Sequence, residues 1–219
     1  MEEKKIHIHI LNATGIFDNY IDKITKNSEE AIWNVVSKIP ISKIDILIYN
    51  NKYKVIKEIG IGGYTGYIGN KIDISINMSY KDLKTSINNE LKRTIAHEMH
   101  HAMRMQTIGY GETLLDGIIS EGLADHFDEE IYGKRIPGIW TAALSSEDIH
   151  LYLKKAKSMF NSTEYNHAEW FFGTDKIPKW TGYSLGYYII DKYLKLNPTK
   201  KPSTIYNKKS KDIIKDLSF

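Results

Sequence analysis

Apolar and polar positions alternate in short runs over the first 80 residues, as is typical of β-strands. Residues 18–39 differ, because their apolar side chains recur at three- and four-residue intervals and the run stops at Pro40, as in an amphipathic helix. The pattern predicts a mainly β lobe over residues 1–80 with one helix. The predicted strands are 5–11, 44–49, 53–59 and 72–76.

A glycine-rich segment, residues 60–70, precedes the last of these strands. No Lys-Ser or Lys-Thr pair opens a helix after it, so its glycine spacing does not fit a phosphate-binding loop. A hairpin fits better, with residues 62–68 as an edge strand, because glycines leave room for another backbone to come close. Such a strand offers N–H and C=O groups to an extended peptide. An ordinary glycine-rich hairpin is the alternative.

Beyond residue 80 the apolar period lengthens to that of helices. Residues 161–180 lack this period but are rich in aromatic side chains, so we expect an irregular segment that either roofs a cleft or seals the core. The chain is expected to be one α+β domain, 1–219, with a mainly helical lobe over 81–219 and a lysine-rich tail. The predicted helices are 85–107, 112–131, 146–160 and 181–196.

The first of these helices contains His97-Glu98-x-x-His101. The two histidines are one turn apart, so both imidazoles leave the same face and can bind a single ion. Glu98 lies about 100° round the helix from His97, where a general base must stand to take a proton from water activated by the metal. The alternative is two histidines and a glutamate on a solvated helix face.

A hydrolytic zinc site normally takes three protein ligands, and the second helix offers Glu121 as the third. Asp125 is four residues further on and shares its face. Asp125 can accept the spare N–H of a ligand imidazole, which would fix the tautomer of that histidine. His100 and His126 point away from the proposed ligands on helical geometry, so we expect both to be bystanders.

Composition narrows the chemistry further. The absence of cysteine excludes disulfides and thiolate ligands, so any transition metal must be held by nitrogen and oxygen. A net charge of +3 disfavours nucleic acid as the main partner. No apolar run is long enough to span a membrane, and the start of the chain lacks the apolar core of a signal peptide, so a cytoplasmic location is expected.

Three stretches carry a family resemblance: 97–104 (HEMHHAMR), 120–127 (SEGLADHF) and 182–188 (GYSLGYY). They resemble the YjaZ-like family of predicted zinc-dependent proteases, a bacterial domain-of-unknown-function family, over about residues 60–194. The resemblance implies a zincin-like fold and a gluzincin-type metallopeptidase. It also implies one Zn²⁺ per chain, bound by His97, His101 and Glu121, with Glu98 as general base.

Two further roles rest on the same resemblance. Peptide hydrolysis by a metal-bound water passes through an oxyanion, which needs a second electrophile beside the metal ion. A phenol can donate the required hydrogen bond. Tyr183 is the first choice and Tyr187 the second, although tyrosines in a Gly-x-x-x-Gly helix are more often packing groups. In zincins the strand that lines the substrate cleft precedes the metal helix by a few tens of residues, which indicates Gly63, Tyr64 and Thr65 as substrate-binding residues.

The sequence therefore favours a zinc metallopeptidase that hydrolyses a peptide or protein substrate. Two alternatives remain open. One is a catalytically inert zincin-fold module that binds peptides or other partners; the presence of Glu98 argues against it, since binding needs no general base. The other is an aminopeptidase, which would need a charged anchor for the substrate amine that the sequence does not reveal.

Overall fold

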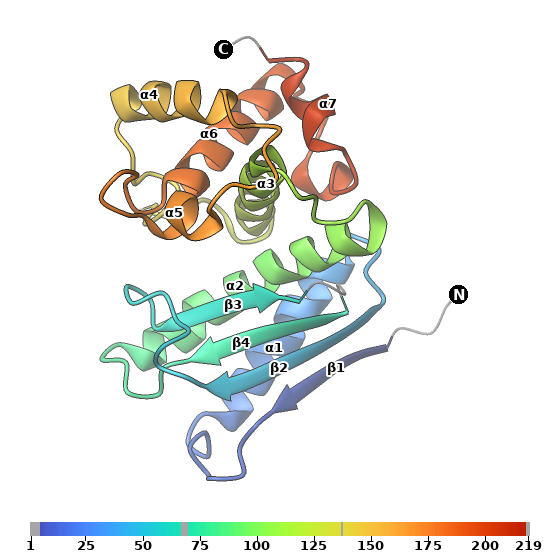
Figure 1. Ribbon diagram of the computed structural model, residues 1–219. Coiled ribbons are helices and arrows are strands. Elements are labelled where there is room, and N and C mark those ends of the chain that lie inside the picture. Colours follow the sequence, from blue (N-terminus) through green and yellow to red (C-terminus); the bar gives the residue numbers. More distant parts are fainter. Residues whose placement is uncertain (1–4, 67–69, 137, 218–219) are drawn as a thin grey trace. The chain divides into compact units, whose positions relative to one another are not determined.

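The computed structural model describes residues 5–66, 70–136 and 138–217 (Figure 1). The chain divides into two compact units, Met1–Gln106 and Thr107–Phe219. The sheet belongs to the first unit, and helices build the second. The predicted α+β class, with a small N-terminal sheet followed by a mainly helical half, is confirmed.

The sheet of the first unit has four strands in the order β1-β2-β4-β3. β1 and β2 are parallel, β2 and β4 are parallel, and β3 runs antiparallel to β4. β3 is therefore an edge strand, as the glycine-rich segment predicted; Tyr67 and Ile68, which the prediction also included, lie outside the described residues. The strands are β1 (Lys5–Ile10), β2 (Lys43–Asn50), β3 (Ile61–Thr65) and β4 (Lys71–Ile76).

One face of the sheet is covered by two helices, α1 (Ile21–Val36) and α2 (Leu83–Thr107), which Figure 1 shows behind the strands. The Asn27 amide nitrogen of α1 donates to the Ile87 carbonyl of α2 at 2.6 Å. On the other face, His7 and His9 of β1 are exposed. The core beneath the helices consists of the alternate isoleucines of the central strands: Ile44, Ile46, Ile48, Ile72, Ile74 and Ile76.

The predicted strand over residues 53–59 is wrong. This segment forms turns, and a single bridge joins Ile56 to Ile61. The Lys54 carbonyl accepts a hydrogen bond from the Ser75 hydroxyl rather than from a strand ladder. The same carbonyl oxygen lies so close to Gly62 that a side chain at this position would collide with it. The segment thus packs beside β3 through its turns, with Tyr53 left exposed.

The second unit is organised around α3 (Leu114–Tyr132) and α6 (Thr181–Leu196). The backbones of these two helices are in contact where they cross. A Cβ added to Gly122 would lie only 2.9 Å from the Cα of Gly186. Thr113 begins α3 with a reciprocal capping box to Asp116. The remaining elements are α4 (Ser146–Lys157), α5 (His167–Phe172), the 3₁₀ helix η1 (Pro202–Thr204) and α7 (Ser210–Ile214).

The aromatic segment over residues 161–180 seals the core of the second unit. It is not wholly irregular as predicted, because Asn166 caps the short helix α5. Trp170 and Phe171 of this helix are buried in the same hydrophobic cluster as α3 and α6. Gly182 leaves the space that the Phe171 ring fills. Within the described parts of both units, no helix combines the length and apolarity needed to cross a bilayer.

Candidate metal centre

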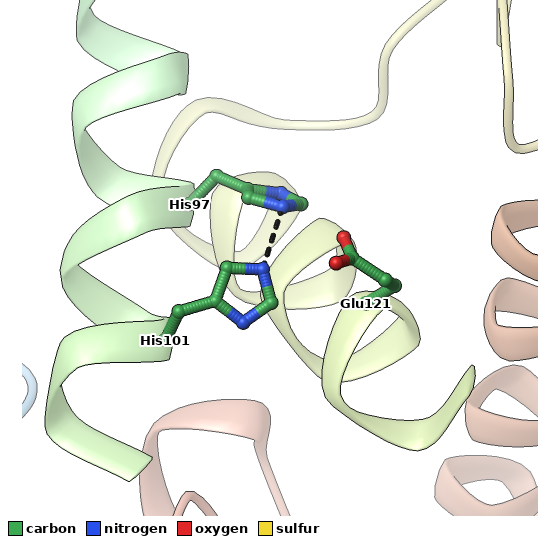
Figure 2. A group of neighbouring side chains, drawn as sticks. All are labelled: His97, His101 and Glu121. Carbon is green, nitrogen blue, oxygen red and sulfur yellow. Dashed lines mark hydrogen bonds between the residues drawn. The ribbon is translucent and has the colours of Figure 1, made fainter. Parts of the chain in front are cut away.

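α2 presents its histidines on one side and packs with the other. Ile87, Leu91 and Ile95 are fully buried and form the apolar stripe that fixes the helix against the sheet. The Nε2 atoms of His97 and His101 face each other at 3.0 Å, and the two rings stand nearly perpendicular (Figure 2). One turn of helix therefore brings two imidazole nitrogens together, as the motif predicted.

Glu121 completes a group of possible metal ligands with these two histidines. Each residue offers one ligand atom, and the three atoms lie within 4.8 Å of one another (Figure 2). Ligands of a tetrahedral zinc ion at about 2.0–2.1 Å are roughly 3.4 Å apart, which lies within this upper bound. Two imidazoles and one carboxylate are also the donor types that zinc accepts in hydrolytic enzymes. The group can hold a divalent metal ion.

Tyr110 supports Glu121 and was not found by sequence reasoning. Its hydroxyl donates to Glu121 Oε1 at 3.1 Å. Burial, followed by the nearby Glu121 carboxylate, holds the pKa of Tyr110 well above its usual value, so the phenol keeps its proton and remains a donor. Tyr110 lies in the short connection before α3, where no periodic pattern could have indicated it.

Asp125 is buried one turn after Glu121 on α3. Its Oδ1 accepts a hydrogen bond from the Trp140 indole Nε1 at 2.9 Å. The guanidinium of Arg135 lies 4.6 Å from the centre of the Trp140 ring. An indole from the loop after α3 thus fixes one oxygen of this carboxylate, a contact that the sequence did not reveal. The expected bond from Asp125 to a ligand imidazole stays a prediction.

Glu98 is held by the edge strand β3. The Thr65 hydroxyl lies 2.6 Å from Glu98 Oε2 and 2.9 Å from the backbone oxygen of the same residue. Gly63 lies against the other carboxylate oxygen, Oε1. Of the three residues expected to bind substrate, Gly63 and Tyr64 are exposed, whereas Thr65 is buried and engaged with Glu98.

The two candidate tyrosines differ in their surroundings. Tyr183 is partly buried and meets Phe171 and Trp180 edge to face, with ring centres 5.3 and 5.4 Å apart. The Tyr187 hydroxyl donates to Glu129 Oε2 at 2.8 Å. Burial and then this hydrogen bond raise the pKa of Tyr187 above its usual value. The Tyr187 proton is therefore committed to Glu129.

His100 and His126, the expected bystanders, also have defined places. His100 is fully buried within α2. The His126 ring stacks on Tyr187 with centres 4.2 Å apart, and its Nε2 lies 3.0 Å from the Tyr187 carbonyl oxygen. The Nε2 atom of His126 is therefore engaged with the backbone of α6.

Two histidines and a glutamate around one point, with a second glutamate next to the first histidine, define a candidate hydrolytic metal centre. The chain belongs to the family described as "Predicted Zn-dependent protease (DUF2268)", whose model matches residues 18–215. The resemblance drawn from the sequence motifs is thereby confirmed.

Two curated relatives come from Bacillus subtilis (strain 168), and both are described as uncharacterized proteins. YjaZ is 35% identical over 106 residues, which cover 46% of this chain and 41% of YjaZ. YjfC is 23% identical over 149 residues, which cover 62% of this chain and 47% of YjfC. The chain thus matches less than half the length of each relative. No solved structure matches it significantly.

Proposed function

We propose that this protein is a zinc-dependent peptidase of the gluzincin type. The observation that carries the proposal is the convergence of His97, His101 and Glu121 on one point, with Glu98 adjacent in sequence. The family description as a predicted zinc-dependent protease agrees with it. One Zn²⁺ per chain would be bound by the two imidazoles and the carboxylate.

When bound, zinc lowers the pKa of a water molecule toward neutrality and polarises a substrate carbonyl. Glu98 takes the proton from this water and later delivers it to the leaving amine. Thr65 engages Oε2 of Glu98, and in the part of the chain that the structure describes Oε1 has no hydrogen-bond partner. Oε1 is therefore the oxygen that accepts the proton.

Tyr183 is proposed to donate a hydrogen bond to the developing oxyanion. The engagement of the Tyr187 hydroxyl with Glu129 makes Tyr187 the weaker choice. The substrate is proposed to be an extended peptide that adds to the outer edge of β3 beyond the Ile56–Ile61 bridge, where Gly63 and Tyr64 are exposed. Backbone pairing would hold the peptide while its side chains remain free to vary.

The test combines metal analysis with digestion of a diverse peptide library. Wild type is expected to contain about one zinc ion per chain and to cleave peptides, and both properties should be lost in His97→Ala and Glu121→Ala. Glu98→Gln should keep its zinc but lose cleavage. Stoichiometric zinc without cleavage by wild type would instead indicate an inert binding module. Release of amino-terminal residues only would indicate an aminopeptidase.

A further inference from the structure

The edge strand β3 touches the side chain of Glu98 at two points, and both contacts lie inside the first unit. One is the Thr65 hydroxyl, 2.6 Å from Oε2. This distance is typical of a hydroxyl that donates to a charged carboxylate. The other is Gly63, where an added Cβ would lie 2.5 Å from both Cγ and Oε1 of Glu98. Strand and side chain thus fit each other closely.

The glycine at position 63 is explained by Glu98 and not by backbone conformation. Gly63 is absent from the positive-φ glycines of the described chain, so its backbone suits any residue. Its neighbour Gly62, in contrast, lies against the Lys54 carbonyl, which is backbone and cannot move aside. The atoms that a Cβ on Gly63 would meet belong to the end of one flexible side chain. A methyl group there would displace Glu98 and leave the fold intact.

We propose that Thr65 and Gly63 are positioning residues, which together fix the carboxylate of Glu98 in the orientation that proton transfer requires. The proposal rests on the proposed function, in which Glu98 is the general base. Thr65 anchors Oε2, and the missing side chain of Gly63 leaves the space that Oε1 occupies. Thr65 therefore acts through Glu98 and makes no contact with substrate.

The second contact of Thr65 explains why a hydroxyl suits this position. A hydroxyl has one proton to donate and can also accept. When Glu98 is a carboxylate, Thr65 donates to Oε2. When Oε1 carries the transferred proton, Oε2 is still an acceptor, so Thr65 can keep donating to it or turn its proton to the Glu98 backbone oxygen 2.9 Å away. Thr65 can thus hold Glu98 in place before and after the proton moves.

The first experiment compares Thr65→Val, which keeps the shape and removes the hydroxyl, with Thr65→Ser, which keeps the hydroxyl. With a peptide that wild type cleaves, Thr65→Val is expected to lower kcat about 10- to 100-fold, because small misplacements of a catalytic group carry such costs. KM and zinc content should not change. Thr65→Ser should restore most of the lost kcat. A raised KM with normal kcat would overturn the proposal, since Thr65 would then contact substrate.

The second experiment uses glycine. Gly63→Ala is expected to lower kcat at an unchanged unfolding midpoint. Gly66→Ala is the matched control, because among the described residues a Cβ at Gly66 meets only the Lys71 carbonyl oxygen, at 3.8 Å, and should leave activity unchanged. Full kcat in Gly63→Ala would overturn the proposal.

Crystal structures of metal-free Thr65→Val and Gly63→Ala separate this proposal from the function on which it rests. We expect the Glu98 carboxylate to leave its wild-type position in both variants. If wild type cleaves no peptide but Glu98 moves in these crystals, the peptidase proposal fails and the positioning role stands. If Glu98 stays in place in both variants, the positioning role fails whatever the activity.

Discussion

At the scale of single residues, the acidic groups of α3 in the candidate metal centre depend on partners outside that helix. Tyr110 donates to Glu121, and Trp140 donates to Asp125. Both donors lie in connecting segments on either side of α3. A buried carboxylate needs such donors because it has lost its hydration. Tyr110 and Trp140 therefore act as hydrogen-bond donors to buried carboxylates in addition to packing.

Tyr110→Phe is expected to weaken zinc binding about tenfold, because loss of a hydrogen-bond partner from a metal ligand typically costs 10- to 100-fold in affinity. The substitution removes only the hydroxyl that orients Glu121. Zinc affinity can be measured by competition with a chromophoric chelator. Tyr20→Phe is the matched control, since its hydroxyl has no partner among the described residues. Equal affinities for both variants would show that Tyr110 does not support a zinc ligand.

Residue spacing indicated the candidate ligands but could not indicate the contacts that support the site. His97 and His101 lie together because residues four apart share a helix face, which is a local property of the chain. Thr65, in contrast, meets Glu98 across 33 positions of sequence. Such a pair depends on how β3 is placed against α2, which only the folded chain determines. The sequence indicated Thr65 as a substrate contact, which stays a prediction, but it did not reveal the hydrogen bond between Thr65 and Glu98.

At the scale of elements, the crossing of α3 and α6 determines the second unit. Gly122 and Gly186 lie on facing surfaces, and a Cβ on Gly186 would be 2.9 Å from the Gly122 nitrogen. The obstructing atoms are backbone, so no side-chain rotation can relieve the contact. The glycines of this crossing allow the helices to approach until backbone meets backbone.

Gly186→Ala is therefore expected to lower the free energy of unfolding by about 3 kcal/mol, at the upper end of the usual cost of overpacking. The helix propensity of alanine would offset less than about 1 kcal/mol of this loss. Urea denaturation followed by circular dichroism measures the effect. Gly66→Ala again serves as the control, since no described atom lies closer than 3.8 Å to a Cβ at that position. Equal stability of the Gly186→Ala variant and wild type would contradict a close crossing.

The element predictions succeeded where one face of a segment is buried. The predicted helix 181–196 matches α6, because its apolar side chains recur with the helical period. The strand prediction for residues 53–59 was wrong. The apolar residues of this segment suggested a strand, whereas the Lys54 carbonyl accepts a hydrogen bond from the Ser75 side chain. Helix α5 was missed because its six residues are too few to establish a period.

At the scale of the whole molecule, metal binding and folding should be coupled. The three proposed ligands lie far enough apart in sequence, from His97 to Glu121, that only the folded chain assembles them. A ligand that binds only the folded state stabilises it by mass action. Zinc at about 1,000 times its dissociation constant would contribute about 4 kcal/mol. For a chain of this size that corresponds to a rise on the order of 10 °C in the unfolding midpoint.

Scanning calorimetry with and without zinc tests this coupling, and the quantity that matters is the zinc-induced shift of each variant. Glu121→Gln is expected to lose most of the shift, because an amide is a much poorer zinc ligand than a carboxylate. His126→Gln should keep it, although its midpoint without metal should fall through loss of the stack on Tyr187. The comparison separates loss of a ligand from loss of packing. A shift that survives Glu121→Gln but disappears in His126→Gln would assign the third ligand to His126 and refute the gluzincin arrangement.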